Sequence, residues 1–149
     1  MDKANEHSKE SVVPRYRVAA IQYAPELFER KRNVADLLHL TREAAENGAK
    51  IIVLPEMATT GICFYNRQEA SAAVEPIPGP TSRAFAEIAA EYDCYIAYGE
   101  AEVDPETDAY YNSSVFVGPE GVVGSYRKTH LFLSEPKWAK AGDLGIPVW

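Results

Sequence analysis

The chain has 149 residues, of which 46% are hydrophobic and 25% are charged, a size and composition typical of one globular domain that buries a core. Asp and Glu outnumber Lys and Arg by 22 to 15, which gives a formal net charge of −7. This balance argues against a nucleic-acid-binding protein, since such proteins usually carry a basic patch. The longest apolar runs are too short to predict a membrane span.

The N-terminal stretch is polar and mixed in charge, and it lacks the apolar core of a secretory signal. We therefore expect residues 1–13 to form a flexible tail and residues 14–149 to form one domain without an internal boundary.

The two cysteines are Cys63 and Cys94. They form no CxxC pair and have no histidine partners at zinc spacing, so the sequence predicts no metal site. Two cysteines in a chain without a signal favour free thiols in a reducing cytoplasm.

The first part of the chain predicts a strand, a helix and a second strand. Residues 17–23 (RVAAIQY) are apolar and β-compatible, and Pro25 bounds them. Residues 30–47 carry apolar side chains at helical spacing, and Gly48 suits the helix C-cap. Residues 51–54 (IIVL) form a continuous apolar run, typical of a parallel strand covered on both faces. This order predicts a βαβ unit of an α/β protein.

The middle of the chain predicts a loop, a helix and a strand. Residues 57–80 are rich in Gly and Pro and predict a loop. Thr81 or Ser82 would then cap the N-terminus of a helix with one apolar face. Residues 94–101 (CYIAYGEA) predict the next strand.

The last part predicts a β-hairpin, made of strands 110–117 (YYNSSVFV) and 122–127 joined by the turn 118–121 (GPEG). From Thr129 onward the pattern is irregular. Residues 146–149 (IPVW) resemble the start of a strand. Because a native domain seldom finishes where a strand begins, we expect the sequence to be truncated.

Two charged residues follow predicted strands. Glu56 comes directly after the IIVL strand and Pro55, and ligands of open α/β sheets bind beyond the carboxyl ends of strands. Partial burial there would raise the pKa of Glu56 toward that of a useful general base. Lys128 follows the last predicted strand, where an ammonium group suits a developing oxyanion. Taken singly, each position is more often an ordinary loop or surface charge.

Other polar residues give weaker signals. His130 would titrate near neutral pH, although a lone histidine more often has a structural role, and Glu135 is unremarkable by itself. Tyr65, Asn66 and Arg67 either line a pocket or lie on a loop surface.

The order of several motifs resembles that of the nitrilase superfamily, the carbon–nitrogen hydrolases. Residues 54–57 (LPEM) with Gly61 resemble the first signature of the family, and residues 126–131 (YRKTHL) resemble the second. Residues 18–22 (VAAIQ) resemble the opening strand of the family, and residues 111–121, with their YNSS and PEG motifs, resemble its hairpin. Residues 141–143 (AGD) resemble the segment after the catalytic lysine. The resemblance extends from about Arg17 to Trp149.

The resemblance implies a four-layer αββα sandwich, of which this chain would supply roughly the first half, with one helix layer and part of both sheets. Family members usually dimerise through a helix face, so a homodimer or larger homo-oligomer is expected. An isolated half would expose sheet faces and edges.

The resemblance also implies a Glu-Lys-Cys triad that needs no metal or organic cofactor. Glu56 would be the general base, Lys128 would stabilise the tetrahedral intermediate, and Glu135 would help to position the substrate and the catalytic groups. Cys63 and Cys94 both precede the lysine motif, so neither matches the family nucleophile, which is expected beyond this chain. Tyr65, Asn66, Arg67 and His130 are candidate substrate-binding residues.

The implied activity is hydrolysis of a non-peptide carbon–nitrogen bond in an amide, nitrile or N-carbamoyl substrate, and this segment alone would be inactive. One alternative is a non-catalytic relative that binds a small molecule or a partner protein. A weaker alternative makes Cys63 a substitute nucleophile, because it shares a loop with Glu56. Protection of this thiol from iodoacetamide by substrate would test that idea.

Overall fold

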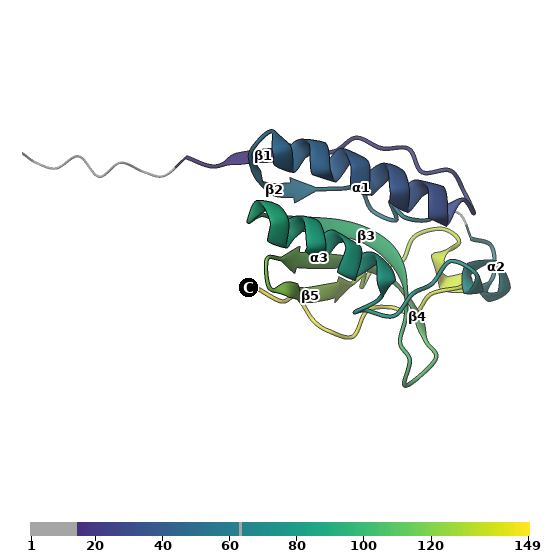
Figure 1. The fold of residues 1–149 in the computed structure, drawn as a ribbon. Helices are drawn as coiled ribbons and strands as arrows, with labels where there is room; N and C mark the ends of the chain where they lie inside the picture. The colour runs from purple at the N-terminus through teal and green to yellow at the C-terminus, as the bar shows by residue number, and fades with distance from the viewer. Residues whose placement is uncertain (1–14, 63) are drawn as a thin grey trace, which may run out of the picture.

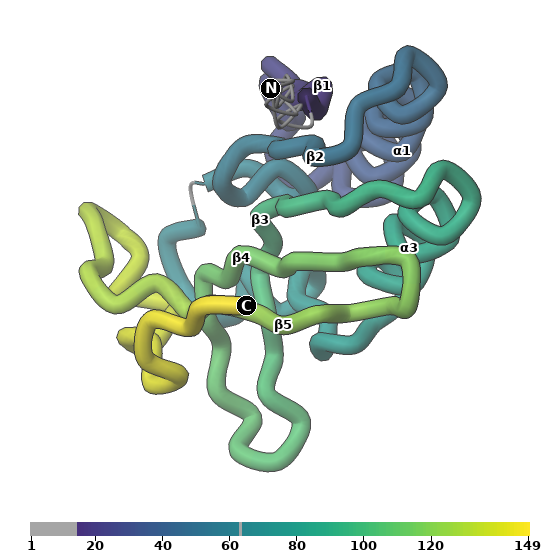
Figure 2. Tube along the Cα trace, turned by 90° about the vertical axis from the view of Figure 1, so that its left-hand side faces the viewer, coloured from purple at the N-terminus to yellow at the C-terminus, as the bar shows by residue number. Residues whose placement is uncertain are grey.

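The computed structural model describes residues 15–62 and 64–149, so the predictions for the N-terminal tail and for Cys63 lie outside the described residues. A five-stranded sheet carries helices α1 (Arg30–Glu46) and α3 (Pro80–Tyr92) side by side on one face (Figures 1 and 2). The chain therefore has the predicted α/β class. Within the described ranges, no helix combines the length and the apolar character that a membrane crossing requires.

The strands follow one another across the sheet in chain order, β1-β2-β3-β4-β5. Their bounds are β1 (Arg17–Ala20), β2 (Ala49–Val53), β3 (Tyr95–Val103), β4 (Tyr110–Gly118) and β5 (Gly121–Arg127). The first three strands are parallel, with α1 and α3 as the crossover helices. The last three are antiparallel neighbours. The predicted βαβ unit and the predicted hairpin are both confirmed.

The described residues form one sheet, whereas the family resemblance suggested parts of two. Ile96 of β3 pairs with Val117 of β4, and Ser114 of β4 pairs with Tyr126 of β5, so hydrogen bonding continues without a break from β1 to β5. The short turns of the two hairpins keep each strand beside the previous one. The chain thus supplies one helix layer and one sheet layer of the αββα arrangement.

The start of α3 differs from the prediction. Gly79 is the N-cap and Pro80 takes the first helical position, whereas the sequence suggested Thr81 or Ser82 as the cap. Proline suits this position because its fixed φ is already helical and its missing N–H is not needed there. The hydroxyl of Ser82 instead accepts a hydrogen bond from the backbone N–H of Gly79 at 2.8 Å.

Two short helices were not predicted. Helix α2 (Arg67–Ser71) starts at Asn66, whose side chain accepts a hydrogen bond from the backbone N–H of Glu69 at 2.9 Å. This Asn-x-x-Glu pattern is a capping signal inside the region taken as a loop. The second is a 3₁₀ turn, η1 (Glu135–Lys137).

Residues 146–149, which resemble the start of a strand, are not part of one. They pair with no neighbouring strand, and the ring of Trp149 stacks on Phe116 with 5.9 Å between the ring centroids.

The main core lies between the helices and the sheet, where Leu37, Ile52 and Phe85 are fully buried. A smaller cluster packs Met57 and Phe64 against Trp138, and the rings of Phe64 and Trp138 meet edge to face with centroids 5.3 Å apart. This second cluster joins the loop after β2 to the segment around η1. It therefore brings Glu56 and Glu135 into the same region.

Candidate active site

Glu56 reaches the site because the chain after β2 packs directly against Gly99 of β3. The N–H of Gly99 donates to the carbonyl oxygen of Pro55 at 3.2 Å. A Cβ atom at Gly99 would lie 2.4 Å from the backbone nitrogen of Met57 and 2.8 Å from the Cα of Glu56. Only glycine admits this close approach, which directs the Glu56 side chain toward Asn112 of β4.

Lys128 follows β5, and its main chain is held on both sides. Its N–H donates to the carbonyl oxygen of Asn112 at 2.8 Å, and its carbonyl oxygen accepts from Gly142 at 2.9 Å. The preceding residue, Arg127, is fixed by ion pairs to Glu102 and Asp143. The ammonium group of Lys128 is therefore carried by a well-anchored stretch of backbone.

The three residues predicted to act in catalysis meet at one point. The Nζ of Lys128 lies 2.8 Å from Oε1 of Glu56 and 2.9 Å from Oε2 of Glu135. The side-chain nitrogen of Asn112 donates to Oε1 of Glu56 at 2.7 Å and to Oε1 of Glu135 at 2.6 Å. One ammonium and one amide thus bridge two carboxylates.

The surroundings favour the charged forms of both Glu56 and Lys128. Burial would raise the pKa of Glu56, but hydrogen bonds from Lys128 and Asn112 outweigh it and hold the pKa below its usual value. This direction is opposite to the rise that its position after a strand suggested. Burial would lower the pKa of Lys128, but its bonds to Glu56 and Glu135 raise it. At neutral pH the site therefore holds a carboxylate–ammonium pair.

The two carboxylates differ in what they can do. The side chain of Glu135 is only 3% exposed, and both of its oxygens accept hydrogen bonds, Oε2 also from the N–H of Phe132 at 2.6 Å. The side chain of Glu56 is 48% exposed, and within the described part of the chain only its Oε1 accepts hydrogen bonds. Glu56 thus has an oxygen available for a proton, while Glu135 serves as a buried counter-ion.

Glu56 also separates two cavities. One, of about 340 Å³, is lined by Asn112, Tyr126 and Lys128 among others. The other, of about 380 Å³, is lined mainly by apolar side chains, including Leu27 and Ile62. Glu56 therefore lines one cavity together with Lys128 and a second cavity together with apolar side chains.

The structure does not bring the candidate substrate-binding residues to these cavities. Asn66 caps α2, and Arg67 lies over the ring of Tyr110, with its Cζ 3.6 Å from the centroid. Tyr65 is exposed, and Nδ1 of His130 contacts the hydroxyl of Thr129 at 3.0 Å. Their role in binding stays a prediction.

Asn112 is a site residue that the sequence did not reveal as such. It was noted only as part of the hairpin motif YNSS, yet its side chain is buried and contacts both carboxylates. An amide side chain within a predicted strand is a signal, because buried amides need hydrogen-bond partners. Its partners depend on the register of the sheet, which periodicity does not supply.

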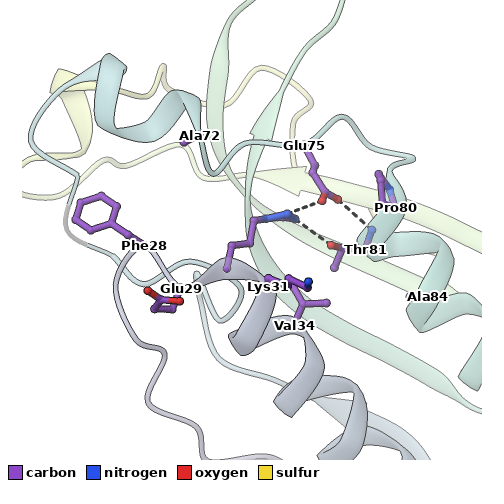
Figure 3. Close-up of a pocket in the computed structure, with 10 residues that line it drawn as sticks. Phe28, Glu29, Lys31, Val34, Ala72, Glu75, Pro80, Thr81 and Ala84 are labelled. Atoms are coloured by element: carbon purple, nitrogen blue, oxygen red, sulfur yellow. Dashed lines mark hydrogen bonds and ion pairs between the residues drawn. The ribbon is translucent and has the colours of Figure 1, made fainter.

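A larger cavity, of about 510 Å³, lies on the helical side of the molecule between the starts of α1 and α3 (Figure 3). Two of the charged side chains that line it, Arg30 and Glu75, form an ion pair. Arg30 binds Glu75 at 2.5 Å and the hydroxyl of Thr81 at 3.0 Å, and Glu75 also accepts from the N–H of Thr81 at 3.0 Å. The contacts among Arg30, Glu75 and Thr81 are therefore typical of a structural network rather than of a reactive site.

Neither a metal centre nor a reactive thiol is visible in residues 15–62 and 64–149. No group of three or more His, Cys, Asp or Glu side chains there is arranged to hold a metal ion. Cys94 is a free cysteine within the main core, where burial raises the pKa of its thiol. Such a thiol is a poor nucleophile.

The chain belongs to the carbon–nitrogen hydrolase family, whose model matches residues 17–149. Among curated relatives, a nitrilase of Pyrococcus abyssi is 40% identical over 134 residues, which cover 89% of this chain and 50% of the relative. A formamidase of Bacillus thuringiensis is 28% identical over 134 residues, which cover 89% of this chain and 40% of the relative. The chain thus spans about half or less of the length of these relatives.

Solved structures share the fold. A carbon–nitrogen hydrolase from Helicobacter pylori G27 aligns with a TM-score of 0.73 and 22% identity, covering 87% of this chain and 46% of that one. An N-terminal amidase aligns with a TM-score of 0.71 and 28% identity, covering 80% of this chain and 29% of that one. The one-sheet, one-helix-layer arrangement therefore corresponds to part of a nitrilase-type fold.

Proposed function

We propose that the complete protein hydrolyses a carbon–nitrogen bond of a small amide or nitrile through a Glu-Lys-Cys triad whose cysteine lies beyond residue 149. The observation that carries this proposal is the ion pair of Glu56 and Lys128, 2.8 Å apart, with one Glu56 oxygen still open to a reacting group. The greater length of the relatives supports a continuation of the domain.

In the proposed reaction, Glu56 takes the proton of the cysteine thiol, because a thiol of pKa about 8.5 is mostly protonated at neutral pH. The thiolate attacks the substrate carbon, and negative charge develops on the amide oxygen or nitrile nitrogen. Lys128 has three N–H donors, of which two carboxylates occupy two, so one is available to that charge. Losing such a donor costs about 3 kcal/mol.

The intermediate then collapses. With an amide, the C–N bond breaks, Glu56 returns its proton to the leaving nitrogen, and a thioester remains. With a nitrile, the first adduct is a thioimidate, whose nitrogen receives the proton from Glu56. A first water then adds to its carbon, the C–N bond breaks, ammonia leaves, and the same thioester forms. Water, deprotonated by Glu56, then attacks the carbon and releases the product, and the thiol is restored. Glu56 thus handles one proton at each step, which requires an oxygen that no neighbour occupies.

The relatives support the proposed substrate class, since they include a nitrilase, a formamidase and an N-terminal amidase. We also propose a homodimer, on the family resemblance, and a reducing cytoplasm, which the free thiol of Cys94 favours.

Two substitutions in the complete protein test the triad. Glu56→Gln removes the base and Lys128→Ala removes the oxyanion donor, so each should abolish amide and nitrile turnover, measured as ammonia release, while circular dichroism shows an intact fold. Substantial remaining turnover in either variant would refute the assignment. The alternative, a non-catalytic binding protein, predicts that the wild type binds a small amide without releasing ammonia.

A further inference from the structure

Asn112 holds the two carboxylates of the site with a single group. The residue is 4% exposed, and its side-chain amide nitrogen donates to Oε1 of Glu56 at 2.7 Å and to Oε1 of Glu135 at 2.6 Å. Both amide hydrogens are therefore used, one for each carboxylate. The opposite amide orientation would place an oxygen against two carboxylate oxygens, so the contacts fix the orientation.

This double donation matters because the site contains more negative than positive charge. Glu56 and Glu135 repel one another, and within the described residues only Lys128 places a positive charge between them. The amide of Asn112 adds a donor to each carboxylate without adding charge. The backbone carbonyl of Asn112 also accepts the N–H of Lys128 at 2.8 Å. Asn112 thus contacts both carboxylates through its side chain and the backbone of Lys128 through its own carbonyl.

We propose that Asn112 is a positioning residue, which binds Oε1 of Glu56 to the Lys128–Glu135 pair and so leaves Oε2 of Glu56 as the oxygen that moves protons. The inference rests on the proposed function, since it assigns Glu56 the role of general base. Asn112 itself touches no reacting atom in this scheme. It acts through Glu56.

A purely structural role predicts a different behaviour. If Asn112 only joined β4 to the η1 segment, its loss would reduce the folded fraction and lower turnover equally at every pH. If it positions and stabilises the Glu56 carboxylate, its loss makes Glu56 easier to protonate, and turnover falls most at low pH. The pH profile therefore separates the two roles.

The experiment compares Asn112→Ser and Asn112→Asp with wild type in the complete protein. We expect the acidic limb of kcat/KM to move to higher pH in Asn112→Ser, and further in Asn112→Asp, which adds a third carboxylate. A shift of one pH unit corresponds to about a tenfold loss on that limb. Asn47→Asp is the matched control, because this exposed residue lies at the C-terminus of α1, away from the site.

A second measurement keeps the inference testable without turnover. The 13C signal of the Glu56 carboxyl group, assigned with Glu56→Gln, should titrate at higher pH in both Asn112 variants than in wild type. If the wild type releases no ammonia, the proposed function fails, and the titration still decides the role of Asn112. Titration midpoints and acidic limbs that match wild type in folded variants would overturn the inference.

Discussion

Two glutamates of this molecule have pKa values displaced in opposite directions. Glu56 is half-exposed and accepts hydrogen bonds from Lys128 and Asn112, which hold its pKa low. Glu100 lies on β3 under the helices and is almost fully buried. Burial raises its pKa to about 7, although Arg30 at 3.1 Å opposes the rise. The direction of each pKa shift depends on which effect is larger. Hydrogen-bond donors lower the pKa of a carboxyl group, and loss of water raises it.

The raised pKa of Glu100 predicts that the free energy of unfolding depends on pH. Because its folded-state pKa lies above the unfolded value, its favourable contribution is complete below pH 4.5 and is lost as pH rises through about 7. Glu100→Gln should therefore reduce the decline in unfolding free energy between pH 5 and pH 8, by up to about 3 kcal/mol. Urea denaturation of the complete protein at both pH values measures this change. Identical pH dependence in variant and wild type would contradict the prediction.

At the scale of elements, the close contact between the chain after β2 and Gly99 of β3 positions Glu56, the proposed general base. Gly99→Ala would place a methyl group 2.4 Å from the Met57 nitrogen, so we expect the Glu56 segment to shift. Such crowding costs about 1–3 kcal/mol. Because displacements of about 1 Å at an active site cost about 100-fold in rate, turnover should fall by that order.

Gly145→Ala serves as the control for this substitution, since an added Cβ there meets no atom within 4 Å. It should leave turnover unchanged and cost only the strain of its positive φ of 72°. Steady-state rates and thermal unfolding of both variants provide the comparison. Wild-type turnover in Gly99→Ala would show that the contact does not position Glu56.

The elements also show what the sequence reveals and what it does not. Helix α1 and strand β2 follow from apolar spacing, and the hairpin follows from its GPEG turn. The cap at Gly79 was missed because Pro80 competes with the hydroxyl residues for the helix start. Positions after predicted strands indicate Glu56 and Lys128, and the family motifs assign roles to both and to Glu135. The link through Asn112 was missed because it depends on neighbours in other elements.

At the scale of the molecule, α1 and α3 both lie on one face of the sheet, and no helix of the described residues covers the other (Figure 2). On the opposite face Val18, Ile51 and Val53 are 65%, 43% and 47% exposed. Contiguous apolar surfaces of this kind promote association. The second sheet of the αββα arrangement would cover this face in a complete domain.

The polypeptide of residues 1–149, produced by itself, should therefore self-associate. Replacing Ile51 and Val53 with lysine should reduce the association, because both side chains point away from the main core and the charges would repel. Sedimentation velocity across a concentration series measures the change. Lys50→Arg, on the same strand, is the charge-neutral control. A monomeric wild-type segment at all concentrations would contradict the expectation.

The sheet order has a consequence for the time course of folding. The antiparallel run of β3, β4 and β5 uses short turns, and contacts close in sequence form early. Glu56 and Lys128 are 72 residues apart, and they meet only after β2 has docked beside β3. We therefore expect the reactive pair to assemble late, on a meander that is already formed. A nascent chain would then form the β3–β5 meander before Glu56 and Lys128 come into contact.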